Sequence, residues 1–342
     1  MNRPAFSRVA AATLLALAIG ALPVRALAQE SRAPTVQIQE WQVPWPDTRP
    51  RDPYLAPDGR IWFVGQLGNY LAVFDPNTEA FERYELPEGT KPHTVVVDDD
   101  GLPWIAGNGN GTILRFDPDS GEYTTYEVPG TPGVKPRDPH TFAFDGRGGI
   151  WFTMQRGNAI GRIDMDSGAI RVIPVPTDGA LPYGILATDS GRAWAVLLGT
   201  NKIAKVEPGT LELTEIALPR EQARPRRIGL TDDGRVWYGD FTQAYIGAYD
   251  PATGEFEEWK TPSARSGPYA MTTDDDGRVW FVETNPQPNL LQGFDPATGK
   301  FLPPTPIPSG GQTVRHMVFD PGTDSLWFGT DTNRLGRARL PD

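Results

Sequence analysis

The chain has 342 residues, with 37 glycines, 35 prolines and no cysteine, and a formal net charge of −11 at pH 7. The high glycine and proline content disfavours long helices, and the lack of cysteine excludes disulfides, a thiol nucleophile and cysteine-bound metals. The acidic balance, without any basic stripe, argues against nucleic acid as a partner, because phosphate-backbone binding needs clustered Lys and Arg.

The first segment, residues 1–28, has the pattern of a secretory signal peptide. Two arginines precede an apolar run over 9–22, and the Ala-Leu-Ala of 26–28 offers a cleavage site. The apolar run is shorter than the roughly 20 residues that span a bilayer. We therefore expect an exported mature protein, residues 29–342, that is periplasmic or extracellular and has no membrane attachment after cleavage.

Internal repeats fill the rest of the chain, and a tryptophan near the start of a short strand marks each one. Within one unit, residues 92–129, four short runs rich in β-branched and aromatic residues are separated by turn residues, which is typical of an antiparallel meander. The repeat length predicts an all-β fold, a seven-bladed β-propeller with four antiparallel strands per blade, forming a single domain. We expect the tryptophans to pack between blades. They recur 42 to 47 residues apart, at Trp62, Trp104, Trp151, Trp194, Trp237, Trp280 and Trp327.

The seventh unit ends after its third strand, at residues 339–340. The missing fourth strand is supplied by residues 36–44, VQIQEWQVP, which match the fourth-strand pattern and precede the first blade. We therefore expect the N-terminal strand to complete the last blade and close the ring, which removes an open sheet edge. We further expect a monomer that binds a small-molecule ligand in its central mouth.

One register of the repeats is polar or aromatic throughout. Counting eleven residues back from each marker tryptophan gives positions that we expect at the mouth of the central channel. All three histidines of the chain fall in this register, which indicates a ligand site; the alternative is a polar, water-filled channel without chemistry. Its members are Arg51, His93, His140, Tyr183, Arg226, Tyr269 and His316, of which the first four are candidates for substrate binding.

Two carboxylates, Asp240 and Glu283, stand three residues after the tryptophans of the fifth and sixth blades, and we expect them near the same mouth. Together with His316 they are candidate metal ligands, and a set richer in oxygen than nitrogen suits Mg²⁺ better than Zn²⁺. The alternative is an ion pair between Arg226 and Asp240, with Glu283 solvated.

The repeated motifs, from about residue 36 to 339, resemble those of the streptogramin B lyases, also called virginiamycin B lyases. They are Pro-His or Pro-Tyr, then Asp-Gly-x-x-Trp-Phe, then Gly-x-Ile-Gly-Arg, as in GNAIGR at 157–162, and a strand ending in Val-Pro. The resemblance implies a seven-bladed propeller that opens a cyclic depsipeptide at its ester by β-elimination, with a histidine base and Mg²⁺.

His316 matches the histidine that the family carries in its last blade. The two positions where the resemblance implies acidic Mg²⁺ ligands hold Val314 and Thr330, whereas Glu283 has the corresponding spacing, fourteen residues after Tyr269, on the neighbouring blade. The acidic set is therefore incomplete or displaced by one blade.

The resulting hypothesis is an exported lyase acting on an ester-linked cyclic small molecule. His316 is the candidate base and Tyr269 the proton donor or orienting group. Arg226, together with Mg²⁺ bound at Glu283, would stabilise the developing negative charge. Two alternatives remain open at this stage: a metal-dependent lactonase or other hydrolase, and a ligand-binding propeller without catalysis.

Overall fold

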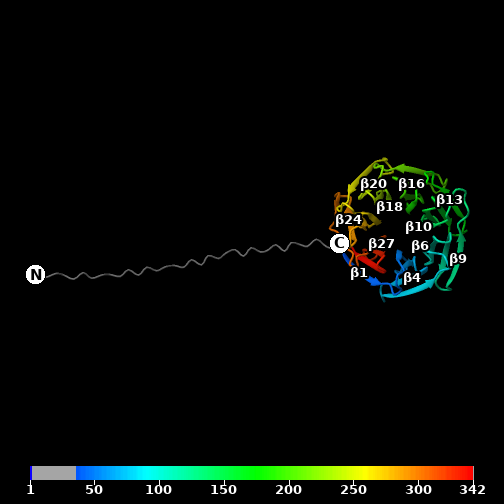
Figure 1. Ribbon diagram of the computed structural model, residues 1–342, viewed down its shortest axis with the longest axis horizontal. Coiled ribbons are helices and arrows are strands. Elements are labelled where there is room, and N and C mark those ends of the chain that lie inside the picture. The colour runs from blue at the N-terminus through cyan, green and yellow to red at the C-terminus, as the bar shows by residue number, and fades with distance from the viewer. Residues whose placement is uncertain (2–35, 342) are drawn as a thin grey trace. The chain divides into compact units, whose positions relative to one another are not determined.

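The computed structural model describes Met1 and residues 36–341, so the predicted signal peptide lies outside the described residues. The described residues contain strands and no helix, so no helix among them is long and apolar enough to span a membrane. They form seven antiparallel sheets arranged around one axis, as predicted (Figure 1).

The first strand of each blade lies nearest the axis, as β6, β10, β18 and β27 do in Figure 1. In six blades it begins with a proline, whose missing N–H is tolerated at the start of a strand. The seven inner strands are β2 (Pro50–Leu55), β6 (Pro92–Val97), β10 (Pro139–Phe144), β14 (Pro182–Ala187), β18 (Pro225–Leu230), β22 (Pro268–Thr273) and β27 (Val314–Asp320).

The second strands are buried along their whole length, because each is covered by a neighbouring blade on both faces. Their sequences are mostly apolar for that reason. They are β3 (Ile61–Gly65), β7 (Pro103–Gly107), β11 (Gly149–Met154), β15 (Ala193–Leu197), β19 (Val236–Asp240), β23 (Val279–Glu283) and β28 (Ser325–Thr330).

The third strands continue each meander toward the rim. They are β4 (Tyr70–Asp75), β8 (Thr112–Asp117), β12 (Ala159–Asp164), β16 (Lys202–Val206), β20 (Tyr245–Tyr249), β24 (Leu290–Asp295) and β29 (Arg334–Arg339).

The fourth strands are half-exposed, and their side chains alternate between half-buried and exposed. That of the sixth blade is split in two, because Pro303 and Pro304 interrupt its pairing with β24. The fourth strands are β5 (Ala80–Glu85), β9 (Glu122–Glu127), β13 (Ile170–Pro174), β17 (Leu213–Ala217), β21 (Phe256–Lys260), the pair β25 (Lys300–Phe301) and β26 (Thr305–Pro306), and β1 (Gln37–Gln42).

The N-terminal strand closes the ring, as predicted. β1 pairs with β29 over six residues, from Gln37 opposite Arg339 to Gln42 opposite Arg334. In Figure 1 the blue N-terminal strand and the red C-terminal strands accordingly belong to one blade. The Glu40 carboxylate adds a link to the preceding blade by accepting hydrogen bonds from the backbone N–H and the hydroxyl of Ser309, at 2.7 and 2.6 Å.

The marker tryptophans are core residues, each at most 1% exposed. Trp62 packs in one cluster with Val95 and Phe116 of the next blade, which confirms the predicted inter-blade role. Acidic turns fix two of the indoles: Asp98 accepts the Trp104 N–H at 2.8 Å. Burial of seven such rings contributes a few kcal/mol each and fixes how the blades stack.

Candidate functional site

A β-bulge in every inner strand shapes the axis. In each blade, the inner strand advances by three residues where the second strand advances by two. In β10, for example, Pro139 pairs with Met154 of β11 and Phe142 pairs with Phe152. The extra residue allows two consecutive side chains to face the axis instead of one. We call the two sets the first ring, the residue directly after the position of the leading proline, and the second ring, the residue after that.

The first ring packs tightly on itself. The rings of His93 and His140 lie 3.4 Å apart between centroids, and His140 and Tyr183 lie 4.3 Å apart. The Tyr183 hydroxyl is hydrogen-bonded to that of Tyr269, two blades away. Arg51, His93, His140 and Tyr183, the predicted substrate-binding residues, are therefore brought together, but each is at most 5% exposed.

Tyr269 is surrounded by cations. The Arg226 guanidinium lies 3.7 Å from the centre of its ring, and that of Arg315 lies 5.9 Å away. Burial alone would raise the pKa of the Tyr269 phenol, but the charges of Arg226 and Arg51 outweigh burial and lower the pKa to about 8. Its partner Tyr183 responds in the opposite direction, because burial and the neighbouring Tyr269 raise its pKa.

The second ring contributes a buried carboxylate, Asp52. It accepts a hydrogen bond from Arg51 Nε at 3.1 Å and another from Arg227 Nη2 at 3.3 Å, and His93 Nδ1 lies 3.8 Å away. Burial opposes ionisation of Asp52, but the two guanidiniums hold the pKa of this carboxyl well below its usual range. Asp52 is therefore the charged centre that joins Arg51 of blade one to Arg227 of blade five.

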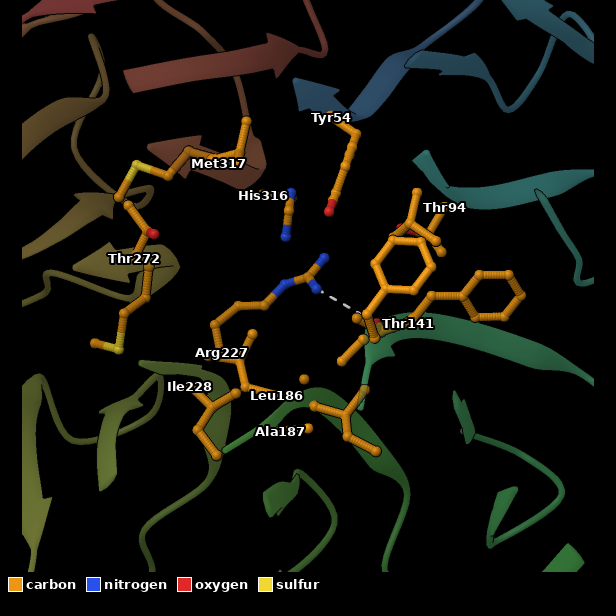
Figure 2. A pocket seen from close by; sticks show the side chains of 18 of the residues that line it. Tyr54, Thr94, Thr141, Leu186, Ala187, Arg227, Ile228, Thr272, His316 and Met317 are labelled. Carbon is orange, nitrogen blue, oxygen red and sulfur yellow. Dashed lines mark hydrogen bonds between the residues drawn. The ribbon is translucent and has the colours of Figure 1, made fainter. Parts of the chain in front are cut away.

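A cavity of about 270 Å³ lies on the axis beside the second ring. Thr94, Thr141, Arg227 and His316 line it together with apolar residues of the inner strands. Figure 2 shows His316 and Arg227 pointing inward, with the hydrogen bond from Arg227 Nη1 to Thr141 Oγ1 at 3.3 Å drawn as a dashed line. This cavity is large enough for a small organic group.

His316 is a neutral base in this setting. Burial, reinforced by the charge of Arg227, lowers the pKa of its imidazole to about 4. Its Nδ1 atom is buried without a hydrogen-bond partner among the described residues. The side chain thus faces the cavity in the unprotonated form at neutral pH.

The structure corrects the ring position of His316. In blade seven Val314 pairs with Thr330, so the residue that follows, Arg315, occupies the first ring and His316 the second. The cause is the connection between β27 and β28, which has one more residue between Phe319 and Leu326 than the corresponding turns of the other blades. Counting eleven residues back from Trp327 therefore stops one position short of Arg315.

The two predicted metal ligands do not join His316. Asp240 accepts hydrogen bonds from Arg220 Nη2 at 2.8 Å and from the backbone N–H of Arg224 at 3.0 Å, so its partner is Arg220 instead of Arg226. Glu283 is fully buried and accepts a hydrogen bond from the Ser263 hydroxyl, so it is not solvated.

These residues do not fit a Mg²⁺ ion on the axis. Residues 36–341 contain no group of three or more Asp, Glu or His side chains placed to hold a metal ion. The axis instead gathers the guanidiniums of Arg51 and Arg227 around the Asp52 carboxylate, with that of Arg226 against the Tyr269 ring, and a divalent cation would meet their charge. Glu283 alone, with one unpartnered oxygen, supplies too few oxygen ligands for the ion.

Three central residues were missed by the sequence analysis: Asp52, Arg227 and Arg315. Each stands beside a residue that was singled out, and a rule that one residue per strand faces the axis excludes them. The available signal was that several inner strands carry two consecutive polar residues after the leading proline, as in Pro50-Arg51-Asp52 and Pro225-Arg226-Arg227. A bulge allows both of these polar side chains to face the axis, so that neither is buried against an apolar face of the blade.

The fold defines a seven-bladed propeller, and the polar axis is its candidate site, where the inner strands converge. The sequence model of the virginiamycin B lyase family matches residues 31–288, which is more than half of the chain. The chain therefore belongs to the virginiamycin B lyase family. The matched range ends before β24, so the outer strands of the sixth blade and the strands β27, β28 and β29 of the seventh blade lie beyond it.

Solved structures agree on the fold. The crystal structure of virginiamycin B lyase from Staphylococcus aureus has a TM-score of 0.80 and 23% sequence identity, covering 90% of this chain and 100% of that one. A streptogramin B lyase structure gives 0.79 and 23%, covering 89% and 98%. A catalytically inactive variant of the S. aureus enzyme with quinupristin gives 0.80 and 24%, covering 90% and 100%. A search of curated proteins gives no match.

Proposed function

We propose that the chain is a lyase that opens an ester-linked cyclic small molecule by β-elimination in the axial cavity, with a guanidinium in place of a metal ion. One observation carries the proposal: His316, held as a neutral imidazole, faces the cavity beside the guanidinium of Arg227. Membership of the virginiamycin B lyase family supports the reaction class.

The two side chains supply the two needs of such an elimination. The His316 imidazole accepts the proton from the carbon next to the substrate carbonyl. Negative charge then develops on the carbonyl oxygen, where N–H groups of Arg227 stabilise it in a site sheltered from water. The ester C–O bond breaks, its electron pair leaves with the carboxylate, and a carbon–carbon double bond remains.

Arg227 is held in place for this role. Its Nε donates to the backbone carbonyl of Arg315 at 2.9 Å, and its two terminal nitrogens donate to Thr141 and Asp52 at 3.3 Å each. Each terminal nitrogen carries a second N–H, so donors remain for a substrate oxygen. Tyr269 and Arg226 belong to the first ring and do not line the cavity.

The test is turnover followed by product mass. The purified mature protein, incubated with a streptogramin B and a panel of lactones, is expected to open a ring without any change in total mass, equally well with Mg²⁺ and with EDTA. A gain of one water would instead identify a hydrolase, and loss of activity in EDTA would show that a metal takes part. No ring opening across the panel would contradict the proposal for these ester classes.

His316→Ala tests the base. General-base catalysis contributes about 10²–10⁴-fold, so kcat is expected to fall at least about 100-fold in the variant. A matched thermal unfolding curve shows whether the variant is folded, and the exposed Arg171→Gln variant serves as a control with unchanged activity. Unchanged turnover in folded His316→Ala would show that the base lies elsewhere.

Export remains part of the proposal, and it rests on the pattern of residues 1–28. N-terminal sequencing of the protein recovered from its native host is expected to begin at Gln29. A chain that retains Met1 in the cell interior would contradict export.

A further inference from the structure

Positive charge on the axis exceeds the negative charge that it meets. Asp331 pairs with Arg315, with a contact of 2.5 Å between Oδ2 and Nη2, and its Oδ1 lies 3.6 Å from Nε of the partly exposed Arg49. Asp52 is shared by two buried arginines, at 3.1 Å from Arg51 and 3.3 Å from Arg227. One carboxylate therefore serves two buried guanidiniums.

Arg226 adds a further cation without a carboxylate. Its guanidinium lies 3.7 Å from the centre of the Tyr269 ring and 4.4 Å from that of Phe241. Within residues 36–341 it forms no ion pair, since the carboxylate of the same blade, Asp240, pairs with Arg220. Cation–π contacts offset only part of the cost of burying a charge.

Two donor atoms of these arginines are unused. Arg51 Nη2 and Arg226 Nε are buried and have no hydrogen-bond partner among the described residues, and the Arg51 side chain is only 5% exposed. A buried donor without an acceptor costs about 1–3 kcal/mol, and more when it is charged. Such atoms mark a place where an acceptor is missing.

The neighbouring titratable groups do not supply the missing negative charge at neutral pH. His93, His140 and His316 have lowered pKa values and are neutral there, because burial and the adjacent arginines disfavour their charged forms. The Tyr269 phenol, whose pKa is lowered to about 8, is still mostly neutral at pH 7. The titratable groups that face the axis within residues 36–341 therefore leave this positive charge uncompensated.

We propose that the axial cavity is a binding site for a small oxyanion, a carboxylate, sulfate or phosphate group, held by Arg227, which shares its one carboxylate partner, Asp52, with Arg51. The cavity of about 270 Å³ has the volume of roughly nine water molecules at about 30 Å³ each. Arg227 lines it, together with the hydroxyl-bearing side chains of Thr94, Thr141 and Thr272. A guanidinium with flanking hydroxyls is a donor set suited to carboxylate or phosphate oxygens.

This inference goes beyond the proposed elimination and does not depend on it. It assigns to the site an anionic ligand group, which is either a free anion or part of a larger molecule. A metal-dependent site would instead bind a cation. Binding is therefore measured without turnover, so that the two proposals can fail separately.

The experiment compares thermal unfolding and calorimetric titration in sulfate, phosphate and acetate with chloride at equal ionic strength. At least one oxyanion is expected to bind saturably and to raise Tm by a few degrees at concentrations well above its Kd. Acetate alone would identify a carboxylate site, and sulfate or phosphate a site for tetrahedral anions. If none of the three exceeds chloride, the proposal is overturned.

Variants locate the site. Arg227→Gln leaves Asp52 paired with Arg51 and is expected to lose the oxyanion-specific rise in Tm, whereas the exposed Arg171→Gln variant keeps it. Should Arg227→Gln not fold, Arg227→Lys retains the charge but loses the planar fork and is expected to bind at least about 10-fold more weakly. An equal Tm rise in wild type and the folded Arg227 variant would overturn the assignment.

Discussion

At the scale of single residues, two tyrosines on the axis have pKa values shifted in opposite directions by their different surroundings. Tyr183 and Tyr269 share a hydrogen bond, yet the pKa of Tyr183 is raised and that of Tyr269 is lowered. The difference arises because the positive charge of Arg226 lies against the face of Tyr269 and favours its ionised form. The negative charge of ionised Tyr269, in turn, disfavours ionisation of Tyr183. Ionisation of one phenol opposes that of the other, so the pair releases one proton first.

This pair gives a titration that can be measured directly. The ultraviolet absorbance of tyrosinate is expected to rise near pH 8, about two pH units below the pKa of an ordinary phenol. The amplitude of this step is expected to correspond to one of the ten tyrosines. Tyr269→Phe is expected to abolish this step. Tyr123→Phe, which removes a tyrosine whose pKa is raised to about 12, is expected to leave it intact. A first step near pH 10 in the wild type would contradict the assignment.

At the scale of the strands, packing explains the glycine that precedes arginine in the third strand of the third blade. Gly161 pairs with Phe152 across β12 and β11, and a Cβ built at Gly161 would lie 2.1 Å from the Phe152 ring. The same pairing joins Gly247 to Tyr238 in the fifth blade. An aromatic ring thus covers a glycine on the neighbouring strand, so this glycine of the repeated motif is a feature of blade packing.

The corresponding prediction concerns stability. Gly161→Ala forces the Phe152 ring to move within a buried strand pair, and overpacking of this kind is expected to cost about 1–3 kcal/mol in the free energy of unfolding. Gly130→Ala is the matched control, because no atom lies within 4 Å of a Cβ there. Denaturant unfolding of both variants provides the measurement. Equal stability of the two variants would refute the packing argument.

The strands also explain which features could be predicted from sequence. The blades were predictable because each marker tryptophan is buried at the corresponding position of its blade, on the second strand. The spacing of the tryptophans therefore gives the length of the repeat. The site was predictable only in part, since it depends on a bulge in each inner strand and on one extra residue in the β27–β28 turn. Asp240 shows a further limit: its partner Arg220 lies in a loop, outside the strand registers that the pattern describes.

At the scale of the whole molecule, an acidic protein encloses a cationic axis. The chain carries a formal net charge of −11, while the point where all seven inner strands converge is rich in arginine. All three histidines share this environment, so their protonation adds positive charge to a region that already has an excess. The protonation of these histidines is therefore coupled to the stability of the entire ring.

The sign of this coupling follows from the pKa values. The folded protein holds its histidines neutral, with the pKa of His316 lowered to about 4 and those of His93 and His140 lowered well below 6.5. The unfolded chain has ordinary histidines near 6.5, so it binds more protons as the pH falls below that value. Stability is therefore fully present above about pH 6.5 and is lost progressively as the pH falls toward about 4.

Denaturant unfolding at pH 7, 6 and 5 measures the effect. Each histidine is expected to contribute a slope approaching about 1.4 kcal/mol per pH unit in the lower part of this interval, because each represents one proton bound only by the unfolded chain. His316→Gln removes one of the three groups and is expected to lessen the slope by about a third. Asp52 does not mask the change, since its lowered pKa keeps it ionised in the folded protein throughout the interval. A free energy of unfolding that is constant from pH 7 to 5 would show that these histidines accept protons as readily in the folded protein as in the unfolded chain, and would contradict their lowered pKa values.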